Sequence, residues 1–181
     1  MYQLYNDVLD SIEMKYIDNV ILTTTLPWYF NQNTIDNNRI NYNDNRVFTH
    51  VLLNRYEATK SLEIESRITS EYFQFFMNIF KNFCVKNGIK FKNIFRMSLN
   101  LTFNEPNEYG VVHVDHNFEH KNFILYLNDF SKGSTFIFED EKIIEEIPAR
   151  KNRAVIFDGL KHAQGFCLQG EHRYILVVTF L

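Results

Sequence analysis

The run YILVVTF at residues 174–180 decides the fold class, because it is apolar at both odd and even positions. Side chains alternate between the two faces of a strand, so such a run must be covered on both faces. The run FILYL at residues 123–127 has the same character. Two sheets packed face to face, with helices outside one of them, supply that cover. Further β-branched and aromatic runs lie at residues 94–103, 111–115, 135–139, 143–147 and 154–158.

The connections between these runs indicate antiparallel pairing, because most of them are too short to hold a crossover helix. Helices are expected earlier in the chain. Residues 70–87 carry apolar side chains at three and four spacing, with Ser70 as a candidate cap, and a shorter helix is expected within residues 6–17. The sequence therefore predicts a mainly β fold with N-terminal helices (α+β): a two-sheet jelly roll packed on helices.

Length and composition indicate a single globular domain. The chain has 181 residues, of which 45% are hydrophobic, so it can bury a substantial core. We expect one domain over residues 1–181, with a helical and lid support region at 1–90 and the jelly-roll core at 91–181. An Asn- and Asp-rich segment, residues 31–45, is the candidate lid.

The charge balance and the cysteines limit the partners and the compartment. The net charge of -3 offers no general attraction to nucleic acid. Cys84 and Cys167 are too few for a secreted disulfide scaffold, and the N-terminus lacks the basic start and apolar run of a signal peptide. We expect no membrane span and a cytoplasmic protein, in the host cytoplasm if the source is viral. The oligomeric state is not predicted.

Three residues form a candidate metal site. His113 and Asp115 are two apart on an expected strand, so their side chains share a face. One such pair is expected by chance in a chain with 6 His and 22 acidic residues, and a surface pair is the alternative. His162 strengthens the pattern because it follows the strand at residues 154–158, and ligands from separate strands converge in a barrel mouth. Two imidazoles and one carboxylate suit iron(II) with open positions for a cosubstrate and dioxygen.

Arg173 completes the pattern at the start of the last strand. Its planar guanidinium suits a carboxylate, although a lone strand-end arginine is more often solvated. Together with His113, Asp115 and His162, it resembles the 2-oxoglutarate oxygenase superfamily, in which an H-x-D pair is followed by a distant His and then by a basic residue.

The C-terminal half resembles in particular the prolyl 4-hydroxylase-like branch, including its small phage-type members. The resemblance rests on ILYLN at residues 124–128, GSTF at 133–136 and IPARKNRAVIF at 147–157. It implies a double-stranded β-helix (cupin-like) core, Fe(II), 2-oxoglutarate and O2, and a tyrosine, Tyr126, that joins Arg173 in binding the distal carboxylate. At Phe103, many members carry a tyrosine that contacts 2-oxoglutarate.

The implied activity is a 2-oxoglutarate-dependent dioxygenase that hydroxylates a peptide or protein side chain, with proline as the first guess. Hydroxylation of a free amino acid, nucleotide or small metabolite is the alternative. A metal-binding jelly roll without activity is a third hypothesis, in which Arg173 and Tyr126 would have no purpose. Tyr109 and Trp28 are candidates for the substrate side. We expect His116, His120 and His172 to be solvated and without a role.

Overall fold

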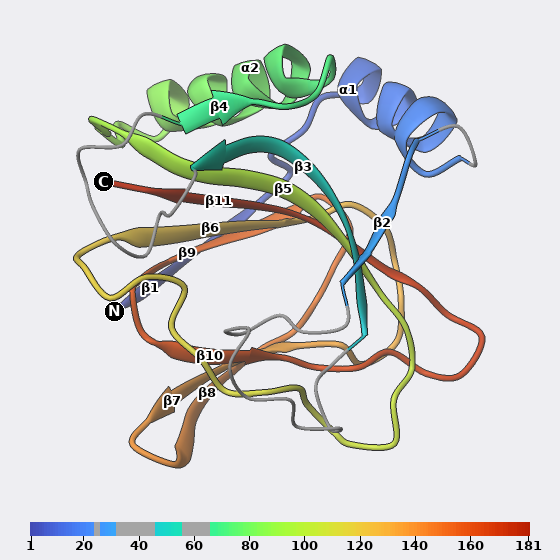
Figure 1. Cartoon of the computed structure of the whole chain (residues 1–181), viewed down its shortest axis with the longest axis vertical. Helices are drawn as coiled ribbons and strands as arrows, with labels where there is room; N and C mark the ends of the chain where they lie inside the picture. The colour runs from blue at the N-terminus through green and yellow to red at the C-terminus, as the bar shows by residue number, and fades with distance from the viewer. Residues whose placement is uncertain (24–25, 32–45, 56–65) are drawn as a thin grey trace.

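The computed structural model describes residues 1–23, 26–31, 46–55 and 66–181, and Figure 1 shows its elements. Two α-helices lie in this part of the chain, α1 (Ser11–Tyr16), which continues into a π-helical turn (Ile17–Ile21), and α2 (Phe73–Lys86). The strands are β1 (Tyr2–Asn6), β2 (Tyr29–Asn31), β3 (Val47–Arg55), β4 (Ser66–Ile68), β5 (Ile94–Thr102), β6 (Lys121–Tyr126), β7 (Thr135–Glu139), β8 (Lys142–Ile147), β9 (Arg153–Asp158), β10 (Lys161–Gln164) and β11 (Arg173–Phe180).

The strands form two antiparallel sheets. The large sheet has the order β1-β9-β6-β11-β5-β3-β2, with β4 beside β3, and the small sheet has the order β10-β7-β8. The small sheet lies below the large one in Figure 1. This arrangement confirms the predicted fold class, a mainly β jelly roll with N-terminal helices.

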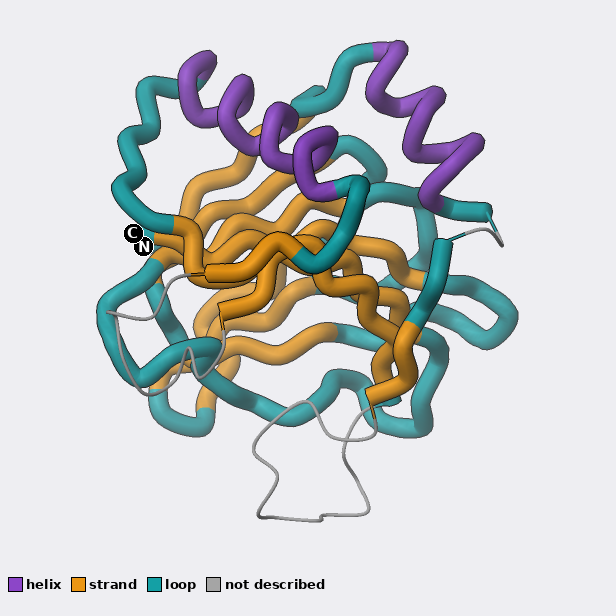
Figure 2. Tube along the Cα trace, turned by 45° about the horizontal axis from the view of Figure 1, so that its top comes forward, coloured by secondary structure: helices purple, strands orange, loops and turns teal. Residues whose placement is uncertain are grey.

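Both α-helices cover one face of the large sheet, as Figures 1 and 2 show from two directions. In α2, Phe76, Phe80 and Phe83 are buried. The ring of Phe80 lies 5.3 Å from that of Phe123 on β6 and 5.1 Å from that of Phe180 on β11. Truncating a buried ring of this size to alanine costs about 3–5 kcal/mol, so this contact fixes the helix on the sheet.

The ends of the helices differ slightly from the prediction. Ser70 accepts a hydrogen bond from the Tyr72 backbone at 3.1 Å, and α2 begins at Phe73. The first helix begins later than predicted, because Asp10 forms a capping box with Glu13. Asn6, the first residue of the predicted range, belongs instead to β1, which pairs with β9, and residues 7–9 connect this strand to the helix.

The first part of the chain contributes strands as well as helices. β1 forms one edge of the large sheet, and β3 pairs with β5 in its interior. The sheet that carries the core therefore includes strands from the region that was expected to supply only helices and a lid. The candidate lid lies outside the described residues, apart from Asn31 at its start. No helix in the described ranges is long and apolar enough to cross a membrane.

The two faces of the large sheet carry different side chains. On the face toward the helices, the side chains of β5 are Met97, Leu99 and Leu101, all buried. The opposite face, which we call the inner face, looks toward the small sheet. There β5 carries a polar row, formed by Arg96, Ser98, Asn100 and Thr102. Along β11 the residues paired with this row are Thr179, Val177, Ile175 and Arg173.

Candidate metal and cosubstrate site

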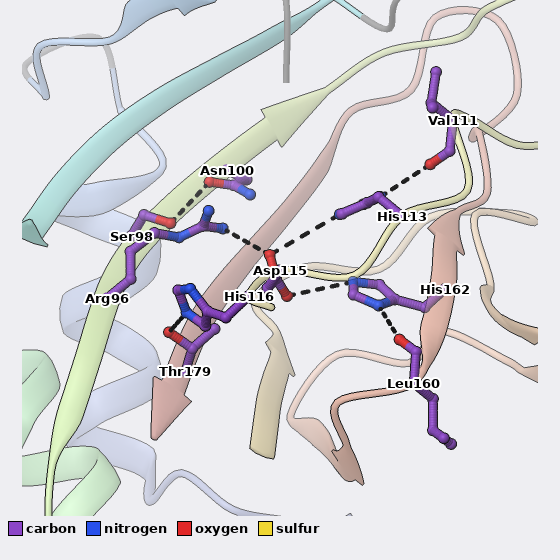
Figure 3. Close-up of polar contacts among 10 residues, drawn as sticks. All are labelled: Arg96, Ser98, Asn100, Val111, His113, Asp115, His116, Leu160, His162 and Thr179. Carbon is purple, nitrogen blue, oxygen red and sulfur yellow. Dashed lines mark hydrogen bonds and ion pairs between the residues drawn. The ribbon is translucent and has the colours of Figure 1, made fainter. Parts of the chain in front are cut away.

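His113, Asp115 and His162 lie together between the two sheets. Their ligand atoms are all within 4.8 Å of one another. The Nε2 atom of His113 is 4.0 Å from one Asp115 carboxylate oxygen, and that of His162 is 3.5 Å from the other. Figure 3 shows both imidazoles directed at the carboxylate. The three residues that sequence spacing selected can therefore contact one ion.

The backbone that carries His113 is not the strand that the sequence predicted. Within residues 111–115 only His113 pairs, in a single β-bridge in which His113 and His162 exchange two backbone hydrogen bonds of 3.0 and 2.8 Å. The bridge ties the two histidines to each other directly. His162 lies on β10, a short strand that was not among the runs predicted from the sequence.

Backbone carbonyls orient both imidazoles. The Nδ1 atom of His113 is 2.9 Å from the carbonyl oxygen of Val111, and that of His162 is 2.9 Å from the carbonyl oxygen of Leu160. A carbonyl only accepts, so each Nδ1 must carry the hydrogen. In a neutral imidazole this leaves the Nε2 lone pair available for a metal ion.

The charges of the site also suit a divalent ion. Burial lowers the pKa of His162 to about 4, although the Asp115 carboxylate opposes this shift. Burial alone would raise the pKa of Asp115, but Arg96 and then the imidazoles of His162 and His113 hold it well below its ordinary value. At neutral pH the site therefore presents a carboxylate and a neutral His162 to an incoming cation.

Arg173 is buried beside this site, with only 1% of its surface exposed. Its Nε donates to the carbonyl oxygen of Gly133 at 3.0 Å, and one terminal nitrogen donates to the hydroxyl of Thr135 at 3.4 Å. Its guanidinium carbon is 5.6 Å from the centre of the Tyr126 ring, and the Tyr126 hydroxyl bonds to the same Thr135 at 2.7 Å. Tyr126 therefore lies next to Arg173, as the resemblance implied.

Two buried polar atoms near Arg173 have no partner in the described part of the chain. One is the second terminal nitrogen of Arg173, and the other is the hydroxyl of Thr102. The two residues face each other across β11 and β5. An unpaired buried donor on a cation is costly, so these atoms indicate a missing anionic partner. A carboxylate that accepts hydrogen bonds from both fits this position.

Arg173 and the three candidate metal ligands line one cavity of about 50 Å³. Its other walls come from both sheets: Arg96, Asn100, Ile124, Thr135, Ala163, Gln164, Ile175 and Val177. This volume is far below the roughly 300–1,000 Å³ of clefts that bind drug-sized molecules. The cavity therefore suits a compact, anionic ligand beside the metal position.

The two residues predicted on the substrate side lie elsewhere. Trp28 packs against Tyr174 in the layer between the large sheet and the helices, with 5.6 Å between the rings. Tyr109 packs against Phe136 and Phe138, which lie on the face of β7 opposite to Thr135. Neither residue lines the cavity that contains the candidate metal ligands.

Sequence reasoning missed Arg96 and Thr102, which both face the inner side of the sheet. Phe103, the position at which a cosubstrate contact was considered, packs on Phe48 and His172 instead, and Thr102 faces Arg173. The alternation of polar and apolar residues along 94–103 was the available signal. His116 and His120 were expected to be solvated, yet they are only 5% and 3% exposed.

The chain resembles solved structures of 2-oxoglutarate oxygenases in fold. No family model and no curated protein sequence matches it. An oxidoreductase of the 2OG-Fe(II) oxygenase family from Burkholderia pseudomallei superposes with a TM-score of 0.73 and 11% identity, covering 99% of this chain and 84% of that one. A prolyl hydroxylase from Trichoplax adhaerens, in complex with a hypoxia inducible factor peptide fragment, has a TM-score of 0.68 and 10% identity, covering 99% of this chain and 83% of that one. The α-ketoglutarate-dependent epimerase SnoN from nogalamycin biosynthesis has a TM-score of 0.65 and 12% identity, covering 99% of this chain and 78% of that one.

Proposed function

We propose that this chain is an Fe(II)- and 2-oxoglutarate-dependent dioxygenase that hydroxylates a side chain of a peptide or protein. Its fold is that of the 2OG-Fe(II) oxygenases. The observation that carries the proposal is one cavity that holds three candidate metal ligands and a buried arginine with an unpaired donor. A metal-binding jelly roll without activity would have no use for that buried, unpaired cation.

The residues present fit both iron(II) and 2-oxoglutarate. His113, Asp115 and His162 would hold the ion, and two imidazoles with one carboxylate leave its remaining positions for exogenous ligands. Arg173 and Thr102 would hold the distal carboxylate of 2-oxoglutarate through their unpaired polar atoms. With both bound, dioxygen would convert 2-oxoglutarate to succinate and carbon dioxide, and one oxygen atom would pass to the substrate.

The chain's own groups position the cosubstrate and keep the cavity dry. Thr135 links Arg173 to Tyr126, and burial raises the pKa of Tyr126, so its phenol stays protonated and neutral. This arrangement holds the guanidinium in one orientation before the ligand arrives. Ile124, Ile175 and Val177 supply an apolar wall, which strengthens the attraction between Arg173 and a carboxylate.

The substrate class is supported by the prolyl hydroxylase from Trichoplax adhaerens, which was solved with a peptide. Proline within a peptide is therefore the first substrate to test. A small molecule is the second candidate, because an epimerase from nogalamycin biosynthesis has the same fold.

The test compares the two substrate classes directly. The protein is loaded with iron(II) without oxygen and then given 2-oxoglutarate, air and either a set of proline-containing peptides or a set of free amino acids and nucleotides. We expect peptides that gain the mass of one oxygen atom, and none with His113→Ala. Oxygenated small molecules with unchanged peptides would favour the second candidate. Consumption of 2-oxoglutarate without oxygenation of either set would contradict both substrate classes.

A further inference from the structure

Arg96 projects from the inner face of β5 into the candidate metal site. One terminal nitrogen lies 3.7 Å from a carboxylate oxygen of Asp115, and the side chain lines the same cavity as Arg173. Figure 3 shows its guanidinium directed at Asp115 from the side of β5, while His113 and His162 approach from other sides. The site therefore contains a second arginine next to the metal position.

The contact with Asp115 does not satisfy this arginine. A charge-assisted hydrogen bond between nitrogen and oxygen is about 2.7–2.9 Å long, so 3.7 Å is an ion pair without a hydrogen bond. The Nε atom of Arg96 is buried and has no hydrogen-bond partner within the described residues. The side chain is 35% exposed, so solvent reaches part of it.

A bound metal ion would make the position of Arg96 less favourable. The ion would bind the Asp115 carboxylate and neutralise its negative charge, which attracts Arg96 when no ion is bound. The cavity would then hold a divalent ion and two guanidinium groups against one carboxylate. Like charges that share a partly buried cavity repel each other, so an anion next to Arg96 would offset the charge of the ion.

We propose that Arg96 binds the carboxylate next to the keto group of 2-oxoglutarate, while Arg173 binds the distal one. This inference rests on the proposed function. Arg173 is paired with Thr102, and Arg96 lies six residues away on β5, about 20 Å along the strand. Both long side chains reach into one cavity, and the candidate metal ligands share that cavity with them. One ligand with a carboxylate at each end would give each guanidinium group an anionic partner.

The alternative source of the anion is the substrate itself, through a carboxylate of its own. The small volume of the cavity, about 50 Å³, argues against a second anion beside the cosubstrate. Arg96 would thus exchange partners: it pairs with Asp115 without a metal ion and with the keto acid when the ion is bound. Its role is to select a ligand with two carboxylates.

The test uses two probes that differ in one carboxylate. These are 2-oxoglutarate and 4-oxopentanoate, which retains the keto group and the distal carboxylate only. Equilibrium titration without oxygen, on the Mn(II)-loaded protein, measures their affinities in wild type and in Arg96→Met. We expect Arg96→Met to weaken the binding of 2-oxoglutarate about 10- to 100-fold and to leave the affinity for 4-oxopentanoate unchanged. Arg96→Lys, which keeps the charge, should lose less affinity for 2-oxoglutarate than Arg96→Met.

Two controls separate this role from a structural one. Arg150→Met removes an exposed arginine outside the cavity and should leave both affinities unchanged. Mn(II) binding without 2-oxoglutarate should be as strong in Arg96→Met as in wild type, or stronger, because a repelling cation has been removed.

Three results would overturn the inference. An equal loss of affinity for both probes in Arg96→Met, or weaker Mn(II) binding in that variant, would show that Arg96 only positions Asp115. Unchanged affinity for 2-oxoglutarate in Arg96→Met would show that the cosubstrate does not contact Arg96, and would leave a substrate carboxylate as its partner. If wild type binds neither probe, the proposed function itself fails.

Discussion

Replacing Arg173 by Met removes the cation that we expect to hold the distal carboxylate of 2-oxoglutarate. The guanidinium is fixed by its bonds to Gly133 and Thr135, and its remaining terminal nitrogen is buried without a partner among the described residues. One charge-assisted hydrogen bond contributes about 1.5–3 kcal/mol. Its loss should weaken 2-oxoglutarate binding by about 10- to 150-fold.

The affinity is measured by calorimetric titration of 2-oxoglutarate into the Mn(II)-loaded protein without oxygen. Thr102→Val is a matched variant of nearly the same shape. It removes one neutral hydroxyl that faces Arg173, so we expect a smaller loss of about 2- to 10-fold. Arg173→Lys keeps the charge but not the planar fork, and its affinity should fall between those of Arg173→Met and wild type.

Unchanged affinity in a folded Arg173→Met protein would refute this reasoning. Folding is checked by the thermal unfolding midpoint, and Mn(II) binding is measured separately. A loss of 2-oxoglutarate affinity that follows a loss of Mn(II) affinity would also count against it, because Arg173 is not expected to hold the metal.

Three further predictions concern stability and reactivity. Burial lowers the pKa of His162 to about 4, so as the pH falls below about 6.5 this residue is protonated first in the unfolded chain. The metal-free protein should therefore lose about 2 kcal/mol of unfolding free energy between pH 7 and pH 4.5 because of this residue. Urea unfolding measures the loss, and the His162→Asn variant should lack this part of it. Gly165→Ala would place a Cβ 2.7 Å from the backbone oxygen of Ser134, so urea unfolding should show a loss of about 1–3 kcal/mol, and an unchanged midpoint would contradict the close packing. Burial raises the pKa of Cys84 to about 12 and also raises the pKa of Cys167. Mass spectrometry should therefore find neither thiol alkylated by iodoacetamide at pH 8 in the folded protein, and both alkylated in urea. Rapid modification of the folded protein would contradict the burial of the two thiols.

The general fold could be predicted because the strands of the core are apolar on both faces. The runs now seen as β5, β6, β7, β8, β9 and β11 were recognised within two residues of their ends. β10 was missed because KHAQ is short and polar at both ends, and its pairing with β7 depends on contacts distant in sequence. β1 was missed because its side chains are largely exposed and its partner is β9.

The candidate site could be predicted only where residue type and spacing carry the information. His113, Asp115 and His162 form such a pattern, and the structure brings them together. Arg96 and Thr102 could not be found this way, because polar residues on a strand usually face solvent and only the packing of the small sheet turns this row inward. Sequence could not place Trp28 relative to the cavity either, because an aromatic neighbourhood does not show which way its side chain points, and it packs toward the helices.

Succinate release from 2-oxoglutarate is the measurement that tests the proposed activity most directly. The protein is loaded with iron(II) without oxygen, exposed to air, and compared with His113→Ala and Arg173→Met. We expect iron-dependent succinate in the wild type and little or none in either variant. Wild-type protein that releases no more succinate than His113→Ala, and that does not bind 2-oxoglutarate in the Mn(II)-loaded form, would contradict it.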